Sequence, residues 1–406
     1  MLKLSRRSIL RGASLAAGLT IATCPLAAAN EGFYSPPLAG QGGDAPEEPV
    51  SLEAIYIGDA WTLASGGIER GSRYIANLSV AAEADLEPLI GWDGATILVS
   101  GLYNNGLSFS ELSGDAQILS NSEGGIEGAR LYEAWIEQDF ADIASLKVGL
   151  YDLNSEFDVL ESSALFIGSA HGIGTDIAQS GEAGPSIFPV TGLSARVQAR
   201  LKPGLTVRAA VLDGVPGNPD RPGRTVIDLS VDDGALLIGE AELSSGGSKI
   251  LFGHWRYTAQ FDTWSGARED GNAGWYLRGE APLLSEPGDE GQGLYVFFRA
   301  GIADGRFNSF DAFVSGGMVY TGPFAGRDDD QLGVAFATAF TGEEYRIAVP
   351  SLKQETALEL TYRAPVASWL SVQPGVHYTI NPSARADISN ALAFVLRTEF
   401  AFETGR

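Results

Sequence analysis

The sequence offers few residues of the types on which catalysis or metal binding usually depends. Its 406 residues include three histidines and a single cysteine, Cys24, which excludes an internal disulfide framework and a cysteine-based zinc site. Glu133 and Glu137 lie four residues apart, so both carboxylates fall on one face of a strand and could mimic the carboxylate pair of a glycoside hydrolase. The acidic run 328–330 could offer hard oxygens to calcium, but it lacks the ligand spacing of a known calcium loop. We interpret both as solvated acids, and expect no cofactor, no metal and no enzymatic activity.

The charge balance narrows the class of protein further. The chain has 51 acidic residues against 27 lysines and arginines, a formal net charge of −24. Nucleic-acid binding needs a basic face that contacts phosphates, so that class is excluded. Hydrophobic residues make up 45% of the chain and the mean hydropathy is +0.03, which is too apolar for a disordered acidic tail.

The first residues are typical of an export signal. In 1–29, a basic start precedes an apolar stretch that ends in three alanines, so we expect cleavage after Ala29. Residues 5–10 also resemble a twin-arginine signal, and residues 21–24 weakly resemble a lipoprotein cleavage site. Residues 30–50 are rich in proline and glycine and are expected to form a flexible leader. No later stretch reaches about 18 consecutive apolar residues, so no membrane-spanning helix is expected in the mature chain.

Polar and apolar side chains alternate with a period of two through most of 51–402. In the last segment, Leu392, Phe394 and Leu396 fall on one face, and Arg397 and Glu399 on the other. Successive side chains of a strand point to opposite faces, so this pattern predicts strands. Sixteen segments follow it, at about 52–63, 73–86, 94–103, 129–140, 145–152, 191–201, 204–213, 235–244, 248–262, 273–282, 292–303, 311–321, 331–340, 355–364, 368–380 and 389–402.

Short and long connections alternate between these segments, as they do in a closed antiparallel barrel whose short turns face the periplasm. A barrel of this strand number is too wide for side chains to fill and leaves an aqueous channel. The sequence therefore predicts an all-β fold, a transmembrane antiparallel β-barrel over 51–402 with a short tail at 403–406. The alternative is a soluble β-sandwich or barrel, whose apolar faces would point inward.

The longest connection, 153–190, mixes aromatic and aliphatic residues such as Phe157, Phe166 and Phe188 with glycine, serine and acids. Long connections in compact domains are usually functional or disordered, and this apolar content argues against disorder. We expect a long loop folded into the lumen, where it sets the constriction.

Several stretches resemble the OprB-type carbohydrate-selective porins of bacterial outer membranes. They are YEAWIEQDF (132–140), LKVGLYD (146–152), ALFIGS (164–169), GPSIFP (184–189), GHWRY (253–257), GRDDDQ (326–331) and ELTYR (359–363). The resemblance implies a sixteen-stranded barrel in the outer membrane that passes sugars by diffusion. One departure is the C-terminus, because outer-membrane barrels usually end on an aromatic residue and here four residues follow Phe402.

Sugars are neutral, carry many hydroxyls and have apolar ring faces, so a sugar pathway needs charged groups for the hydroxyls and aromatic rings to stack against. Both types occur on the faces expected to line the lumen. The candidate substrate-binding residues are Glu133, Trp135, Glu137, Arg196, Arg200, Arg208, Arg256, Arg278, Arg299, Glu359, Arg363 and Trp369. The alternative for each charge is an ion pair within the wall, and for each aromatic ring a place in the membrane-interface girdle or under the loop.

The expected partners are permeating mono- or small oligosaccharides and outer-membrane lipid, in either a monomer or a homotrimer. Two other functions stay open at this point, a general porin for small polar solutes and an outer-membrane barrel enzyme.

Overall fold

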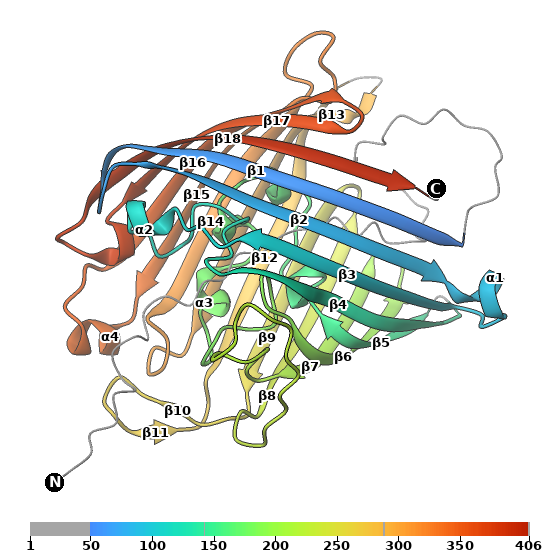
Figure 1. Ribbon diagram of the computed structural model, residues 1–406, viewed down its shortest axis with the longest axis horizontal. Coiled ribbons are helices and arrows are strands. Elements are labelled where there is room, and N and C mark those ends of the chain that lie inside the picture. The colour runs from blue at the N-terminus through green and yellow to red at the C-terminus, as the bar shows by residue number, and fades with distance from the viewer. Residues whose placement is uncertain (1–48, 142, 287–288, 405–406) are drawn as a thin grey trace.

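Sixteen strands close into an antiparallel barrel (Figure 1). The computed structural model describes residues 49–141, 143–286 and 289–404, so the expected signal 1–29 and nearly all of the expected leader lie outside the described residues. The barrel strands are β1 (Val50–Gly67), β2 (Ser72–Asp85), β3 (Ala95–Asn105), β4 (Glu127–Phe140), β5 (Ala144–Tyr151), β6 (Gly192–Lys202), β7 (Leu205–Asp213), β8 (Ala235–Ser245), β9 (Ser248–Tyr257), β12 (Ala273–Glu286), β13 (Asp289–Ala303), β14 (Phe310–Thr321), β15 (Gln331–Thr341), β16 (Gln354–Ala367), β17 (Leu370–Ile380) and β18 (Ser389–Thr404).

Every segment that the alternation predicted overlaps one of these strands, which confirms the predicted barrel. The segment predicted at 248–262 ends earlier, at Tyr257, because β10 (Phe261–Asp262) and β11 (Arg268–Glu269) pair with each other outside the barrel. Strand β1 pairs along its length with β18, with Asp59 opposite Arg397, so the sheet has no free edge.

The helices are short and lie in the connections. They are α1 (Leu86–Ile90), α2 (Ser110–Ser113), α3 (Thr175–Ala178) and α4 (Glu343–Ala348), with 3-10 turns η1 (Leu153–Ser155), η2 (Ser162–Leu165), η3 (Ser169–His171) and η4 (Pro382–Ala384). Within the described ranges, no helix has both the length and the apolar character that a membrane span requires.

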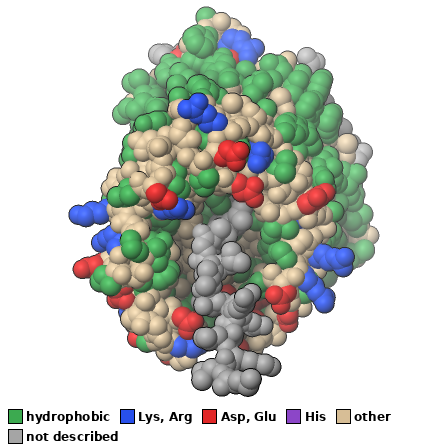
Figure 2. Space-filling model, turned by 60° about the vertical axis from the view of Figure 1, so that its left-hand side comes forward, with side chains coloured by type: hydrophobic (Ala, Val, Ile, Leu, Met, Phe, Trp, Pro, Cys, Tyr) green, Lys and Arg blue, Asp and Glu red, His purple; other side chains and the backbone are tan. Residues whose placement is uncertain are grey.

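The outer face of the barrel is apolar. On β18, Phe394 and Leu396 are 45% and 46% exposed, whereas their neighbours Ala393 and Val395 are buried on the inside. Figure 2 shows hydrophobic side chains over the flanks, with charged side chains gathered at the end that carries the long connections. A soluble barrel would have the opposite arrangement, so the apolar belt identifies a surface that faces lipid.

Strand β9 departs from the predicted assignment of faces. Its Trp255 and Tyr257 point inward and are buried, while His254 and Arg256 lie on the outer face beside the exposed Phe252. The cause is the content of the lumen, because Trp255 and Tyr257 pack in one apolar cluster with residues of an inward-folded loop. Arg256 is therefore corrected from a lumen position to an outward one, near the rim at which β9 ends.

A charge introduced on the lipid-facing outer surface should destabilise the barrel by an amount that depends on its depth in the membrane. Leu360 lies at the middle of β16 and is 50% exposed on the lipid side, so Leu360→Arg should destabilise the folded barrel by about 2–4 kcal/mol. Leu243→Arg places the same change close to the short turn that follows β8, where the cost should be about 0–1 kcal/mol. Urea unfolding from lipid vesicles measures both, and equal costs would contradict the assignment of faces.

Candidate functional site

The connection between β5 and β6, residues 152–191, folds inside the barrel. Its Phe157 and Ile177 are fully buried and share an apolar cluster with Trp255 and Tyr276 of the wall. Farther along the same loop, Phe166 packs against Phe297 with ring centroids 5.5 Å apart. The loop therefore crosses the lumen and contacts inward-facing side chains of several strands, which narrows the channel.

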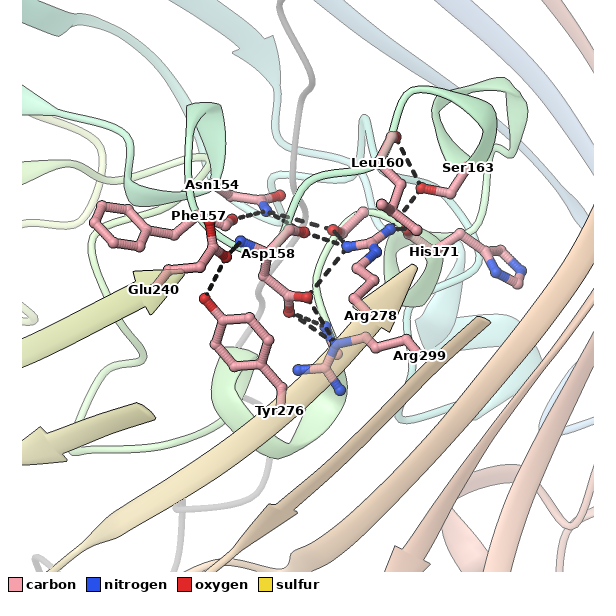
Figure 3. A network of polar contacts seen from close by, with 12 residues as sticks. Asn154, Phe157, Asp158, Leu160, Ser163, His171, Glu240, Tyr276, Arg278 and Arg299 are labelled. Carbon is pink, nitrogen blue, oxygen red and sulfur yellow. Dashed lines mark hydrogen bonds and ion pairs between the residues drawn. The ribbon is translucent and has the colours of Figure 1, made fainter. Parts of the chain in front are cut away.

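Asp158 is the centre of the polar contacts between this loop and the wall (Figure 3). Arg299 Nε donates to both Asp158 carboxylate oxygens, at 2.9 and 2.8 Å, and its Nη1 reaches Asp176 Oδ1 at 2.6 Å. Arg278 Nη1 bonds the Asp158 main-chain oxygen and lies 3.3 Å from Oδ1. All four side chains are buried, so each charge needs these partners in order to remain ionised there.

Three wall carboxylates hold the loop by its main chain. Glu240, Glu280 and Glu359 each accept hydrogen bonds of 2.8–2.9 Å from loop N–H groups. The N–H groups belong to Asp158, Ser162, Ile167 and Gly168. Charge-assisted bonds of this kind are among the stronger ones in proteins, so the wall fixes the path of the loop as well as its charged side chains.

A second connection, 106–126 between β3 and β4, also folds inward, which was not predicted from the sequence. Glu355 accepts hydrogen bonds from the main-chain N–H groups of residues 116 and 117, at 2.8 and 2.9 Å. Ser120 Oγ donates to Asp59 at 2.8 Å, and Asp59 also pairs with Arg397 at 2.8 Å. The available signal was the apolar content of this connection, whose Phe109 and Leu119 are buried beneath β1 and β18.

On the side of the loop that leads to the short turns, the wall of β4 to β9 keeps charged groups partly open to water. Lys147 Nζ lies 2.7 Å from Glu156 and 3.2 Å from Glu137. Arg196 Nε lies 2.6 Å from Glu156, and Arg196 Nη2 lies 2.7 Å from Glu137. The two acids are about one-fifth exposed and the two cations lie behind them.

The same pattern continues along the next strands. Arg208 pairs with Glu240 at 2.7 Å and with Glu242 at 3.0 Å, and Lys249 pairs with Glu161 of the loop at 2.8 Å. Within this region, the water-exposed members form what we call the charged arc. It consists of Glu137, Glu156, Glu161, Arg208, Glu242 and Lys249.

Burial and neighbouring charges keep one titratable group of the loop charged and another neutral. Burial acts to raise the pKa of the Glu156 carboxyl, but the Lys147 and Arg196 charges outweigh burial and hold that pKa well below its usual range. Burial, followed by the Arg278 charge, lowers the pKa of the His171 imidazole to about 3. Glu156 is therefore a charged hydrogen-bond acceptor at neutral pH, and His171 is a neutral packing residue.

The remaining candidate residues fall into different places. Glu133 is buried and is not the solvated acid that was predicted, because it accepts a bond of 3.1 Å from the N–H of residue 152, where the loop begins. Trp135 is only 9% exposed and lies under Lys147, whose ammonium is 4.0 Å from the ring centroid. Arg200 is exposed near the end of β6. Arg363, across the lumen on β16, pairs with Glu399 at 3.2 Å.

Trp369 is the second correction to the predicted lining. Its ring is 44% exposed and stacks on Phe400 and Phe402, with centroids 5.9 and 6.3 Å away. Phe402 belongs to the exposed outer face, so Trp369 is a girdle residue at the membrane interface and not part of the lumen. Trp369 lies in the short turn 368–369 between β16 and β17, where the alternation that places strand residues does not apply.

The candidates therefore divide into anchors and channel-lining groups. Arg278, Arg299 and Glu359 hold the loop, whereas Glu137 and Arg208 belong to the charged arc, with Arg196 directly behind it. Lys147 was not among the predicted site residues, although it lies on the inward face of a predicted strand. Across the described ranges, no group of three or more His, Cys, Asp or Glu residues is arranged to hold a metal ion.

Comparison with known proteins identifies relatives over almost the whole described barrel. Residues 69–268 and 264–402 match the family described as carbohydrate-selective porin, OprB family. Porin B of Pseudomonas aeruginosa is 23% identical to this chain over 412 residues, covering 88% of each protein.

Solved structures share the fold. The high-pH structure of Pseudomonas putida OprB superposes with a TM-score of 0.77 at 21% identity, covering 87% of this chain and 94% of that one. The low-pH structure of the same protein gives a TM-score of 0.56 at 19% identity, over 87% and 93% of the two chains.

The Asp158 contacts predict a variant with a loosened loop. Asp158→Asn keeps the side-chain size but removes the charge that faces Arg278 and Arg299, and breaking a buried pair of this kind costs about 3–5 kcal/mol. We expect higher and noisier single-channel conductance in planar bilayers, together with protease cleavage inside 152–191.

Glu182→Gln is the matched control for this variant. Glu182 is an exposed acid in the same loop, with no side-chain partner among the described residues. The conductance of the Glu182→Gln channel should therefore equal that of the unmodified protein. Heat-modifiable gel mobility shows that both barrels are folded. Identical current noise in the two variants would contradict the anchoring role of Asp158.

Proposed function

The chain belongs to the OprB family of carbohydrate-selective porins, and from this premise we propose that neutral mono- and small oligosaccharides cross it along the charged arc. The protein is a channel of the bacterial outer membrane, and the family and the barrel fold indicate a channel rather than an enzyme.

The observation that carries this proposal is the mixture of both charge signs on one exposed arc. Each acid of the arc lies 2.7–3.2 Å from a base, either in the arc itself or, for Glu137 and Glu156, from Lys147 behind it. Each exposed group keeps lone pairs or N–H groups that a sugar hydroxyl can use. Because neighbouring charges are paired, the arc presents hydrogen-bonding groups without a strong attraction for ions of one sign. Such a surface suits a neutral, hydroxyl-rich solute.

An aromatic ring lies close to one end of the arc. Tyr295 on β13 is half-buried and shares the inward face with Phe297, and its cross-strand partner Pro282 lies two residues after Glu280. We propose that the ring face of Tyr295 packs against the apolar face of a sugar ring, while Lys249 and Glu161 bind its hydroxyls.

A conservative variant of the arc tests this pathway. Lys249→Gln removes a charge whose ion pair with Glu161 is partly exposed, so the barrel should lose less than about 1 kcal/mol of stability. Hydrogen bonds to charged groups are worth about 1.5–3 kcal/mol, so the half-blocking concentration of glucose in planar-bilayer recordings should rise about tenfold or more.

The control for this variant is Arg363→Gln, which removes a cation from the opposite wall of the same lumen, where Arg363 pairs with Glu399. We expect this variant to keep the glucose block of the unmodified channel. Loss of block in both variants, or in neither, would overturn the arc as the sugar pathway. Liposome swelling with solutes of graded size and charge then separates a sugar channel from a general porin.

A further inference from the structure

Strand β5 is too short to pair with the whole length of its neighbour β4. Strand β5 pairs with β4 only between Ala134 and Phe140, so the first half of β4 has no strand beside it on that side. A segment of the loop after β7 covers this gap (Figure 1). Thr225 Oγ1 donates to the Leu131 main-chain oxygen at 2.6 Å, and Arg130 Nη1 donates to the Pro222 oxygen at 3.0 Å. Residues 222–225 therefore close the wall at the rim that carries the long connections.

The seam between this segment and β4 contains a pocket of about 550 Å³. It is lined by residues 127–129 of β4 and 221–224 of the loop. Arg221 and Arg224 are both exposed, and neither side chain forms a hydrogen bond or an ion pair with any residue that the structure describes. Glu127 is the single acid of the lining, so the pocket has an excess of positive charge.

An apolar groove of about 450 Å³ adjoins this pocket on the outer face, starting at the next residues of β4, 130 and 131. Exposed Leu52, Val80 and Val99 form its sides. Its floor includes Gly101, which is paired with Val80 and so faces outward with it. A Cβ atom at position 101 would meet only a main-chain oxygen at 3.7 Å, so the groove exists because this position has no side chain.

We propose that the pocket and the groove together bind one membrane lipid whose headgroup carries a phosphate. The order of the two hollows along β4 matches such a lipid, with cationic side chains at the rim and apolar side chains within the belt that faces lipid. Arginine suits phosphate because its planar guanidinium donates two parallel hydrogen bonds. The phosphate lies between Arg221 and Arg224, and an acyl chain lies over Gly101.

Charge complementarity favours a lipid over a second copy of this chain as the occupant. A second copy would have to bring an anion to the two arginines and an apolar side chain to the groove at the same time. A phosphate-bearing lipid supplies both in one molecule. The inference does not depend on the sugar pathway, because neither hollow opens onto the charged arc.

The headgroup half is tested with the double variant Arg221→Gln/Arg224→Gln in the full mature chain. Native mass spectrometry from detergent measures retention of dioleoyl phosphatidic acid, with dioleoylglycerol and inorganic phosphate as separate probes. We expect the unmodified protein to retain phosphatidic acid and neither of the other two. The double variant should bind phosphatidic acid about tenfold or more weakly, since two charge-assisted contacts are lost.

The control pair is Arg268→Gln/Arg385→Gln, which removes the same charge from the same rim. These two arginines are exposed but already face Asp262 and Asp387. Retention should match that of the unmodified protein. Equal loss in both double variants would show a general charge effect and overturn the site. Retention of inorganic phosphate alone would overturn the lipid as its occupant.

The site of the acyl chain is tested with Gly101→Leu, which places a side chain in the groove and whose added Cβ would meet only a main-chain oxygen at 3.7 Å. Gly239→Leu is its control, because Gly239 also faces outward and its added Cβ would meet only a main-chain oxygen at 3.9 Å. Retention of phosphatidic acid should fall about tenfold in the first variant and stay unchanged in the second, with sugar conductance unchanged in both. If Gly101→Leu instead alters the oligomer mass and leaves lipid retention intact, the groove is a contact between copies and the proposal is overturned.

Discussion

The structure depends on one constraint, which is that charges enclosed in a wide barrel must find partners. A closed sheet of this size leaves a lumen that its own side chains do not fill, and a loop that enters it brings main-chain N–H groups that need acceptors. The wall supplies these acceptors as carboxylates and supplies arginines for the acids of the loop. Asp158 illustrates the mutual dependence, because it binds Arg299 by its side chain and Glu240 by its N–H group. Each partner would be a buried, unpaired group without the others.

Packing of apolar side chains also fixes the position of the loop, at the point where its middle meets β15. Leu165 and Phe166 lie against β15, where the inward positions are Gly333, Ala335 and Ala337. A Cβ atom on Gly333 would come within 2.6 Å of the Leu165 side chain, so small residues on this strand provide the space that the loop occupies. Polar anchors and small wall residues thus specify the same loop position by independent means.

The sequence was sufficient for the barrel but only partly for its interior. Period-two alternation depends on the backbone alone, so it located all sixteen strands and assigned the faces of β18 correctly. It failed at β9, because it assumed a wet lumen where Trp255 and Tyr257 meet the apolar side of the loop. Nor does a local pattern contain the pairing of Asp59 with Arg397, since the two residues lie at opposite ends of the chain and meet only where the barrel closes.

Anchoring also explains how so acidic a chain presents a balanced channel surface. Arg278, Arg299 and Glu359 of the wall form hydrogen bonds with the loop and are buried. They therefore contribute little to the surface that a solute contacts. What stays exposed is the charged arc, in which Glu137 and Glu156 are backed by the buried Lys147 and Arg196, and Glu161 faces Lys249. Opposite charges this close cancel at the distance of a passing ion, yet each group still offers a hydrogen bond to a hydroxyl in contact. The way in which the loop is held thus decides which charged groups of the wall stay open to the channel.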